Sequence, residues 1–287
     1  MKLAVCSHCT IDTTGSGGSS ERQLGGPACY SSITARRLKF DVDLFTRFGP
    51  DFPHSYLEGE GIRVNCAPGG GPTTGITMED GSEGSAVIGD LCGPVEFAGT
   101  DADGILASPV FGEITQDVLD NIRRCGGDLF LDPLGFLRKK GPGGRLILEG
   151  QGPGLDGAAV RVGPAEAACI TGKTGQDAMA ALQKMGAKSV LYADAPEVSL
   201  LAGDRLYSLK LPNKKRHDTV GLGAILSAAF ACTMLKEDDQ LWALSFAAGA
   251  AQAALDSDEP GTSKVPPRGA VESNASYFYN TVDFKGV

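Results

Sequence analysis

The stretch DTVGLGAILSAAF, residues 218–230, combines a glycine turn with the beginning of a helix. Gly221 and Gly223 fall in the turn, and small or apolar residues continue from Ala224. The first turn of a helix presents unpaired backbone N–H groups and the positive end of the helix dipole. Although Ala224 can neither accept a proton nor bind a metal, the backbone around it therefore predicts an anion site.

Outward from this stretch, segments of strand length alternate with segments of helix length. Strands are expected at 1–6, 41–48, 104–108, 128–132, 159–162, 189–192 and 205–210, and helices at 27–38, 115–125, 164–170, 177–185, 225–236 and 241–255. Such alternation is typical of a mostly parallel sheet covered by helices on both faces. The sequence therefore predicts one α/β domain over residues 1–287, a Rossmann-like three-layer αβα sandwich. The tail from residue 260 is polar and weakly patterned.

Two segments interrupt the alternation. Residues 12–26 are rich in glycine and serine, and residues 61–98 contain short β-like pieces, with a hairpin expected around Asp80-Gly81. We expect both segments to form a small β lid. In parallel sheets, ligands gather beyond the carboxyl ends of the strands, so Asp12, Asp132 and the turn at 218–224 should lie on that rim.

The charge balance limits the partners. The chain has 26 Lys and Arg against 35 Asp and Glu, a net charge of −9, although basic clusters occur at 138–140 and 214–216. This excess of acid argues against a general attraction to nucleic acid or to an anionic membrane. The N-terminus is too short and polar for a signal peptide, and no apolar tract reaches the ~20 residues of a membrane span. We therefore expect a cytoplasmic protein that binds neither nucleic acid nor a membrane.

Cysteine and histidine give no metal pattern. Eight cysteines are scattered, only Cys6 and Cys9 form a CxxC pair, and the three histidines, His217 among them, lack ligand spacing. A four-ligand zinc site needs more than this, so reduced thiols are expected.

Residues 167–174, AACITGKT, fit a relaxed phosphate-loop pattern around Lys173. That site requires a strand before the loop and a helix that opens at the Lys-Thr pair. The preceding residues 164–168 favour a helix instead, and Gly172 is then expected to be its C-cap. A phosphate-loop NTPase is consequently a weak alternative.

Several short motifs follow one another in a meaningful order. They are Ile11-Asp12-Thr13, Gly25-Gly26-Pro27-Ala28, LDPLGFLR at 131–138, Glu166 at the head of EAACITG, and DTVGLG at 218–223. In this order, over about residues 1–255, the chain resembles the ribokinase-like (PfkB) carbohydrate kinase family. The resemblance is strongest to its short archaeal-type sugar, inositol and nucleoside kinases.

The resemblance implies transfer of a phosphoryl group from ATP or ADP, with Mg²⁺, to a hydroxyl of a sugar, polyol or nucleoside. A lid of this family can also form a homodimer interface. The resemblance implies an anion hole formed by Gly221, Leu222 and Gly223. It implies nucleotide binding by Asp218, Thr219, Gly221 and Gly223, and substrate binding by Asp12, Gly25 and Gly26. It also implies that Glu166 orders magnesium through water. Each motif also has a plain structural alternative, as a turn, a cap or a first-turn acid.

The chain departs from the family pattern at four places. Ala224 stands where the family has its catalytic Asp, Gly163 replaces the Asn of the NxxE motif, and Tyr30 lies where an Asn usually follows the glycine pair. Residues 193–198 keep none of the signature residues of the family's nucleotide loop. Because a general base contributes ~10²–10⁴ in rate, two alternatives stay open. The chain is a kinase with impaired or altered catalysis, or a non-catalytic binding protein that retains the sugar pocket.

Overall fold

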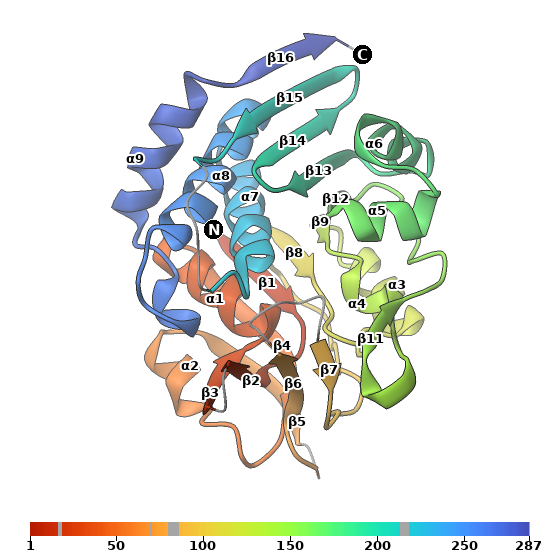
Figure 1. The fold of residues 1–287 in the computed structure, drawn as a ribbon, viewed down its shortest axis with the longest axis vertical. Coiled ribbons are helices and arrows are strands. Elements are labelled where there is room, and N and C mark those ends of the chain that lie inside the picture. The colour runs from red at the N-terminus through yellow and green to blue at the C-terminus, as the bar shows by residue number, and fades with distance from the viewer. Residues whose placement is uncertain (17–18, 69–70, 80–85, 213–217, 287) are drawn as a thin grey trace.

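A ten-stranded sheet forms the centre of the computed structural model, which describes residues 1–16, 19–68, 71–79, 86–212 and 218–286 (Figure 1). The strand order is β16-β15-β14-β13-β12-β9-β8-β1-β4-β5. Neighbours from β13 to β5 pair in parallel, and β14, β15 and β16 add an antiparallel end. The strands are β1 (Lys2–Cys6), β4 (Asp41–Phe48), β5 (Arg63–Pro68), β8 (Gly104–Ala107), β9 (Asp128–Leu131), β12 (Ala159–Val162), β13 (Ser189–Asp194), β14 (Glu197–Ala202), β15 (Arg205–Lys210) and β16 (Asp283–Gly286).

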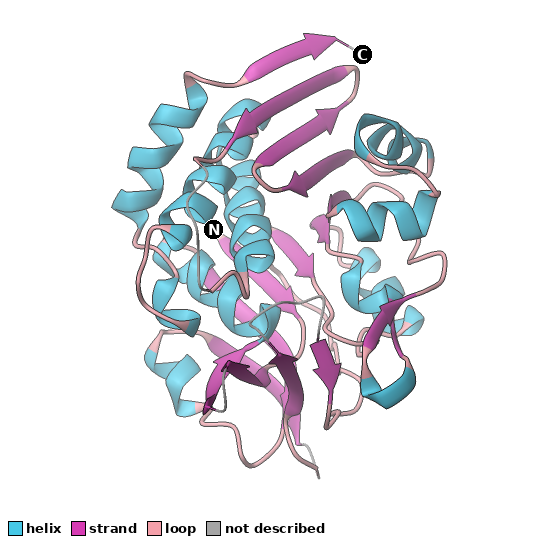
Figure 2. Cartoon of the chain, viewed as in Figure 1, coloured by secondary structure: helices cyan, strands magenta, loops and turns pink. Residues whose placement is uncertain are grey.

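Helices cover both faces of the sheet, which confirms the predicted three-layer sandwich (Figure 2). Successive residues of a strand point to opposite faces, so Leu3 and Val5 join one core while Ala4 and Cys6 join the other. One layer contains α1 (Gly26–Arg37), α7 (Leu222–Glu237), α8 (Gln240–Leu255) and α9 (Arg268–Tyr279), and the other contains α3 (Gln116–Arg124), α5 (Pro164–Thr171) and α6 (Gly175–Lys184). The short helices are α2 (Ser55–Gly59), α4 (Leu134–Leu137), and the 3₁₀ turns Pro142–Gly144 and Gly261–Lys264.

A separate four-stranded sheet forms the lid, in the order β3-β2-β6-β7. Its strands are β2 (Thr10–Ser16), β3 (Ser19–Gly25), β6 (Thr74–Glu79) and β7 (Ala86–Ile88), from the two predicted insertions. One part of that prediction is wrong, because β5, within 61–98, belongs to the central sheet. It pairs in parallel with β4, and Val64 packs on the main core.

Three expectations fall outside the described residues: the hairpin around Asp80-Gly81, the basic cluster at 214–216, and His217. Within the described part of the chain, no helix has the length and apolar character to cross a membrane.

His8 lies at the junction of the lid and the central sheet, in the short link between β1 and β2. Its ring nitrogens make hydrogen bonds to the Thr74 hydroxyl (Nδ1, 3.0 Å) and the Gly93 carbonyl oxygen (Nε2, 2.8 Å). These two residues stand where the chain enters the lid at β6 and after it leaves β7. A single buried ring therefore ties together the strand connections on which the lid is mounted.

The tail contains more structure than its sequence suggests. The helix α9 packs on α8, and Gly249 permits the close approach, because a Cβ there would lie 2.8 Å from the Ala275 nitrogen. The strand β16 then pairs with β15. The segment after β9 contains a hairpin of β10 (Arg138–Lys140) and β11 (Leu146–Leu148).

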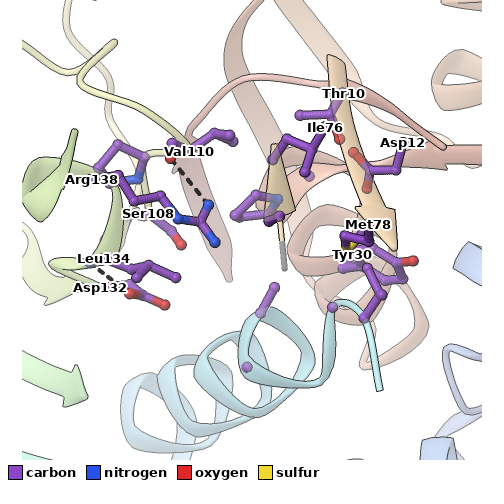
Figure 3. Close-up of a pocket in the computed structure, with 18 of the residues that line it drawn as sticks. Thr10, Asp12, Tyr30, Ile76, Met78, Ser108, Val110, Asp132, Leu134 and Arg138 are labelled. Carbon is purple, nitrogen blue, oxygen red and sulfur yellow. Dashed lines mark hydrogen bonds between the residues drawn. The ribbon is translucent and has the colours of Figure 1, made fainter. Parts of the chain in front are cut away.

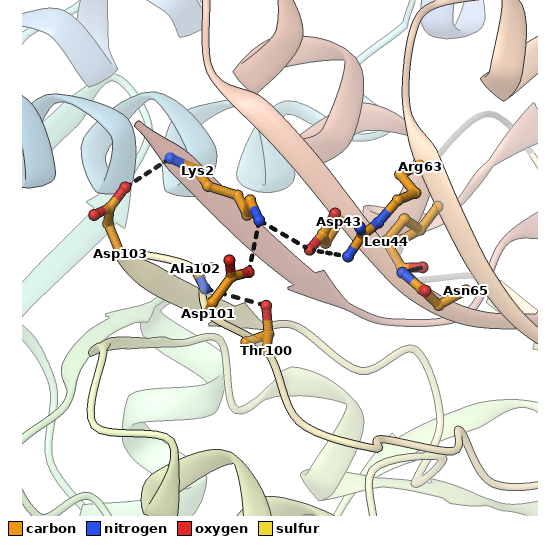
Figure 4. Close-up of polar contacts among 9 residues, drawn as sticks. All are labelled: Lys2, Asp43, Leu44, Arg63, Asn65, Thr100, Asp101, Ala102 and Asp103. Carbon is orange, nitrogen blue, oxygen red and sulfur yellow. Dashed lines mark hydrogen bonds and ion pairs between the residues drawn. The ribbon is translucent and has the colours of Figure 1, made fainter.

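Charged side chains occupy the end of the sheet where the parallel strands begin (Figure 4). The Asp43 side chain is only 4% exposed and lies 2.7 Å from Arg63 Nη2 and 3.8 Å from Lys2 Nζ. Lys2 also contacts Asp101 at 2.6 Å. Ion pairs therefore close this end of the sheet, and the cavity described next lies at the other.

Candidate functional site

A cavity lies beneath the lid, beyond the carboxyl ends of the parallel strands (Figure 3). It contains about 690 Å³ of empty space, part of which is open to solvent. Its residues fall into five groups. They are Thr10 and Asp12 of β2; Gly26, Pro27 and Tyr30 of α1; Ile76, Met78 and Ala86 of the lid; Ser108, Pro109, Val110, Asp132, Leu134, Arg138 and Arg161 of the sheet rim; and Val220, Gly221, Gly223 and Ala224 at the start of α7.

Asp12 is buried and lies on the lid strand β2, within the segment 12–26 that was expected to form the lid. Gly25 lies diagonally across the β2–β3 pair from Asp12, whose direct partner is Gln23, and a Cβ on Gly25 would overlap the Asp12 carboxylate. Gly26 has a φ of +77°, and a Cβ there would lie 2.6 Å from the His8 carbonyl oxygen. The glycine pair thus makes room for the carboxylate and for the strand connection next to it.

The start of α7 forms another wall of the cavity. Gly221 is its N-cap and has a φ of +78°. The Leu222 N–H donates to the Thr219 carbonyl oxygen at 3.3 Å, so this one of the predicted anion-hole donors is engaged within the turn. Gly223 and Ala224 line the cavity in the first helical turn. Ala224, which has no group that could accept a proton, therefore lies next to the space where a ligand would bind.

The Asp218 side chain links the turn before α7 to the C-terminal tail at Gly261 and Lys264. Its Oδ1 accepts the Val220 N–H at 3.0 Å, and its Oδ2 accepts the Gly261 N–H at 3.1 Å. The same Oδ2 lies 2.7 Å from Nζ of Lys264, whose side chain is 1% exposed. Asp218 thus has a structural role that the sequence did not suggest, and 46 residues separate it from Lys264.

Tyr30 lies on α1 between this turn and the lid. A Cβ on Gly221 would lie 2.5 Å from its ring, and Lys264 Nζ lies 5.6 Å from the ring centroid. Burial, and then the Asp218 and Asp12 carboxylates, raise the pKa of the Tyr30 hydroxyl, so this group stays protonated. Its buried oxygen has no hydrogen-bond partner within the described residues. It is therefore available to a ligand.

Arg161 was not predicted as a site residue. Arg161 is a residue of β12, and its Nη1 lies 3.3 Å from Asp132 Oδ2 and 3.6 Å from Glu166 Oε1. Asp132 Oδ1 also accepts the Leu134 N–H at 3.2 Å. The guanidinium lies against Gly223, where a Cβ would be 2.8 Å from Nη2. A buried charged cluster thus reaches the first turn of α7.

The residues present do not offer the metal site implied for Glu166. Its carboxylate faces the Arg161 guanidinium, and Gly163 supplies no side chain beside it. Across the described ranges, no three His, Cys, Asp or Glu side chains are grouped closely enough to hold a metal ion.

The expected nucleotide loop at 193–198 is a tight hairpin. Asp194 ends β13 and pairs with Glu197, which begins β14, so only Ala195 and Pro196 form the turn. The strand β14 was not expected. A two-residue turn has no glycine-lined loop in which a nucleotide could be wrapped.

The phosphate-loop alternative around Lys173 is wrong. The segment before it is the helix α5, which ends at Gly172 in the left-handed conformation, with a φ of +68°. The next helix, α6, begins only at Gly175. Lys173 therefore lies between two helices, without the strand that a phosphate loop requires.

Searches against protein-family models and curated proteins find no match. Solved structures do match. A pyrophosphate-dependent kinase in the ribokinase family, complexed with a pyrophosphate analog and myo-inositol, is 20% identical, with a TM-score of 0.82 over 94% of this chain and 99% of that chain. Arabidopsis thaliana ribokinase complexed with ribose and ATP is 20% identical, with a TM-score of 0.73 over 95% and 98%.

The ribokinase of Thermotoga maritima is 17% identical, with a TM-score of 0.70 over 96% of this chain and 99% of that chain. The three likenesses agree along almost the whole length of the chain. They confirm that this chain has the ribokinase-like fold, as the sequence motifs predicted.

Proposed function

We propose that this chain is a carbohydrate kinase of the ribokinase-like type, which transfers a phosphoryl group to a hydroxyl of a sugar-like substrate. One observation carries the proposal: Asp12 and Asp132 lie on opposite sides of one cavity, with the start of α7 between them (Figure 3). Arg161, which also lines the cavity, forms an ion pair with Asp132. Phosphoryl transfer depends mainly on positioning and on neutralising charge. The cavity has a place for an acceptor at the lid and for an anionic donor at α7.

The acceptor would bind on the lid side. Asp12 accepts hydrogen bonds from hydroxyls, the buried Tyr30 hydroxyl adds a donor, and Ile76 and Met78 give an apolar cover. A ring that carries several hydroxyls suits this mixture. The neighbours in complex with myo-inositol and ribose support a polyol or sugar, with a nucleoside as the third candidate.

The donor would bind at the start of α7, where Gly223 and the Arg161 guanidinium meet. ATP or ADP is the donor implied by the resemblance. The two-residue turn at Ala195-Pro196 lacks the nucleotide loop of the family pattern, and Asp194 and Glu197 add negative charge on both sides of it. Pyrophosphate needs only a phosphate site, and one neighbour is a pyrophosphate-dependent kinase. We therefore place pyrophosphate beside ATP and ADP as a candidate donor.

Ala224 limits the expected rate. Loss of a general base costs ~10²–10⁴ in rate, or about 3–5 kcal/mol of activation free energy. Substrate binding does not need the base, so the same observation favours a second candidate, a non-catalytic sugar-binding protein.

Phosphoryl transfer from ATP, ADP and pyrophosphate to a panel of inositols, sugars and nucleosides tests both candidates. The native chain is compared with Ala224→Asp, with Lys173→Ala as a control outside the cavity. Turnover that rises ~10²-fold or more in Ala224→Asp supports a kinase that lacks only its base. Equal turnover in the two would assign the base elsewhere. No turnover in either, together with binding of a polyol that Asp12→Asn removes, would favour the binding protein.

We propose that two copies of the chain form a homodimer through the lid. The lid is a separate sheet with an edge strand at each side, β3 and β7, and edge strands offer unpaired backbone groups to a second copy. A molar mass close to the monomer's 29.7 kDa in light scattering would rule this out.

A further inference from the structure

The guanidinium of Arg161 lies between two carboxylates, that of Asp132 directly after β9 and that of Glu166 in α5. A single nitrogen, Nη1, is within 3.6 Å of both Asp132 and Glu166. We infer that Arg161 is a resident cation, which takes the place between Asp132 and Glu166 where a divalent metal ion would otherwise bind. This inference goes beyond the proposed function, because it concerns the charge built into the fold.

Burial makes a counter-cation necessary. Asp132 and Glu166 are only 5% and 7% exposed, and both lie close to one guanidinium. Two buried carboxylates that share a site repel each other and lose the hydration that would stabilise their charges. The Leu134 N–H satisfies one oxygen of Asp132 and brings no full charge. Arg161 lowers the charge of the cluster from −2 to −1.

The same residues fit a metal ion poorly while Arg161 is present. Magnesium requires near-octahedral oxygen ligands at about 2.0–2.1 Å, whereas here two carboxylates face a guanidinium nitrogen. A side chain at position 163 could have added a ligand, but it is a glycine, and a Cβ there would lie 2.9 Å from Glu166 Oε2. The positive charge between Asp132 and Glu166 is therefore the Arg161 side chain and not a bound ion.

The other side of the guanidinium is directed to α7. Nη2 would lie 2.8 Å from a Cβ on Gly223, so the absence of a side chain there lets the guanidinium reach the first helical turn. A guanidinium keeps its positive charge at any pH near neutrality and is fixed to the backbone by its side chain. If the proposed function holds, Arg161 places this fixed positive charge beside the donor phosphates without a dissociable ion.

Thermal unfolding of the full chain, with and without MgCl₂ or MnCl₂, tests the inference. The native chain is expected to keep its Tm when metal is added. Arg161→Met should lower Tm by about 5–10 °C, since it leaves two buried carboxylates uncompensated. Added metal should restore much of this loss, and the double variant Arg161→Met/Glu166→Gln should lose that response. Arg205→Met, at an exposed arginine of β15, is the matched control and should change neither value.

Two results with the native chain and Arg161→Met would overturn the inference. One is a rise in Tm of the native chain with metal that Glu166→Gln removes, which would place a metal at Glu166 beside Arg161. The other is a destabilised Arg161→Met that does not respond to metal. Should Arg161→Met fail to fold, Arg161→Lys keeps the charge and must be folded and metal-insensitive; a metal-dependent Tm in that variant would also overturn it. None of these measurements requires turnover, so a failure of the proposed kinase activity is recognised separately.

Discussion

The ring of Tyr30 lies directly against the backbone of Gly221, the residue from which α7 starts. A Cβ at position 221 would lie 2.5 Å from two ring carbons, and the φ of +78° disfavours any side chain there. Position 221 therefore requires glycine for two independent reasons, one steric and one conformational. Both reasons concern the wall of the cavity.

Gly221→Ala should destabilise the fold by about 2–4 kcal/mol, the sum of a strained backbone and a forced shift of the ring. Urea unfolding measures the loss. Gly203→Ala is the matched control, because Gly203 also has a positive φ, +61°, but has no atom within 4 Å of the Cβ position. It should lose only about 1 kcal/mol. Equal losses in the two variants would show that the ring contact has no energetic weight.

Lys264→Met should cost about 3–5 kcal/mol, because it removes the cation from a largely buried ion pair with Asp218. The double variant Lys264→Met/Asp218→Asn should recover part of this loss, since no uncompensated carboxylate remains. Lys188→Met breaks a 3.3 Å pair with Asp128, in which the two side chains are 57% and 55% exposed. That control should cost no more than about 1 kcal/mol. Chemical denaturation that finds similar losses for both lysines would contradict the role of burial.

Tyr30→Phe should leave stability unchanged or raise it slightly, because its hydroxyl is buried without a partner in the described structure. Tyr56→Phe is the contrasting control, since the Tyr56 hydroxyl bonds to the Thr262 hydroxyl at 2.9 Å and its loss should cost about 1 kcal/mol. Calorimetric titration with myo-inositol should show weaker binding to Tyr30→Phe and normal binding to Tyr56→Phe. A clear loss of stability in Tyr30→Phe would mean that the hydroxyl is already bonded.

The native chain should react with iodoacetamide only at its partly exposed cysteines. Burial raises the pKa of Cys6 and Cys232 well above the usual thiol value, and only the thiolate reacts. Mass spectrometry at pH 8 should find the label on the four accessible thiols and none on the four buried ones. The accessible set is Cys66, Cys92, Cys125 and Cys169, and the buried set is Cys6, Cys9, Cys29 and Cys232. Label on Cys232 without denaturant would reveal opening between α7 and its neighbours.

Local patterns predicted the alternating part of the fold well. Strands such as β1 and helices such as α7 follow from a few adjacent residues, and the glycine turn at 221–223 indicated the correct end of the sheet. Pairing between distant segments was not predictable in this way. The strand β16 is polar and exposed, and it is a strand only because β15 offers its edge.

The site follows the same division. Asp12, Gly221 and Ala224 were expected on the rim, and the structure brings them to one cavity. The residues near Arg161 and Lys264 in the sequence did not predict their roles. Each side chain pairs with a carboxylate that is 29 or 46 residues away in the chain. Sequence motifs therefore identified the backbone of the site, whereas the charges around it required the fold.

The strand β2 has a consequence for the working cycle of such a cavity. Asp12 is carried by the lid sheet, whereas α7 and Arg161 belong to the central body. If the proposed function holds, the side chain that binds the acceptor and the residues that bind the donor therefore belong to different parts of the fold, and the distance between the two substrates depends on how the lid sheet is held at His8.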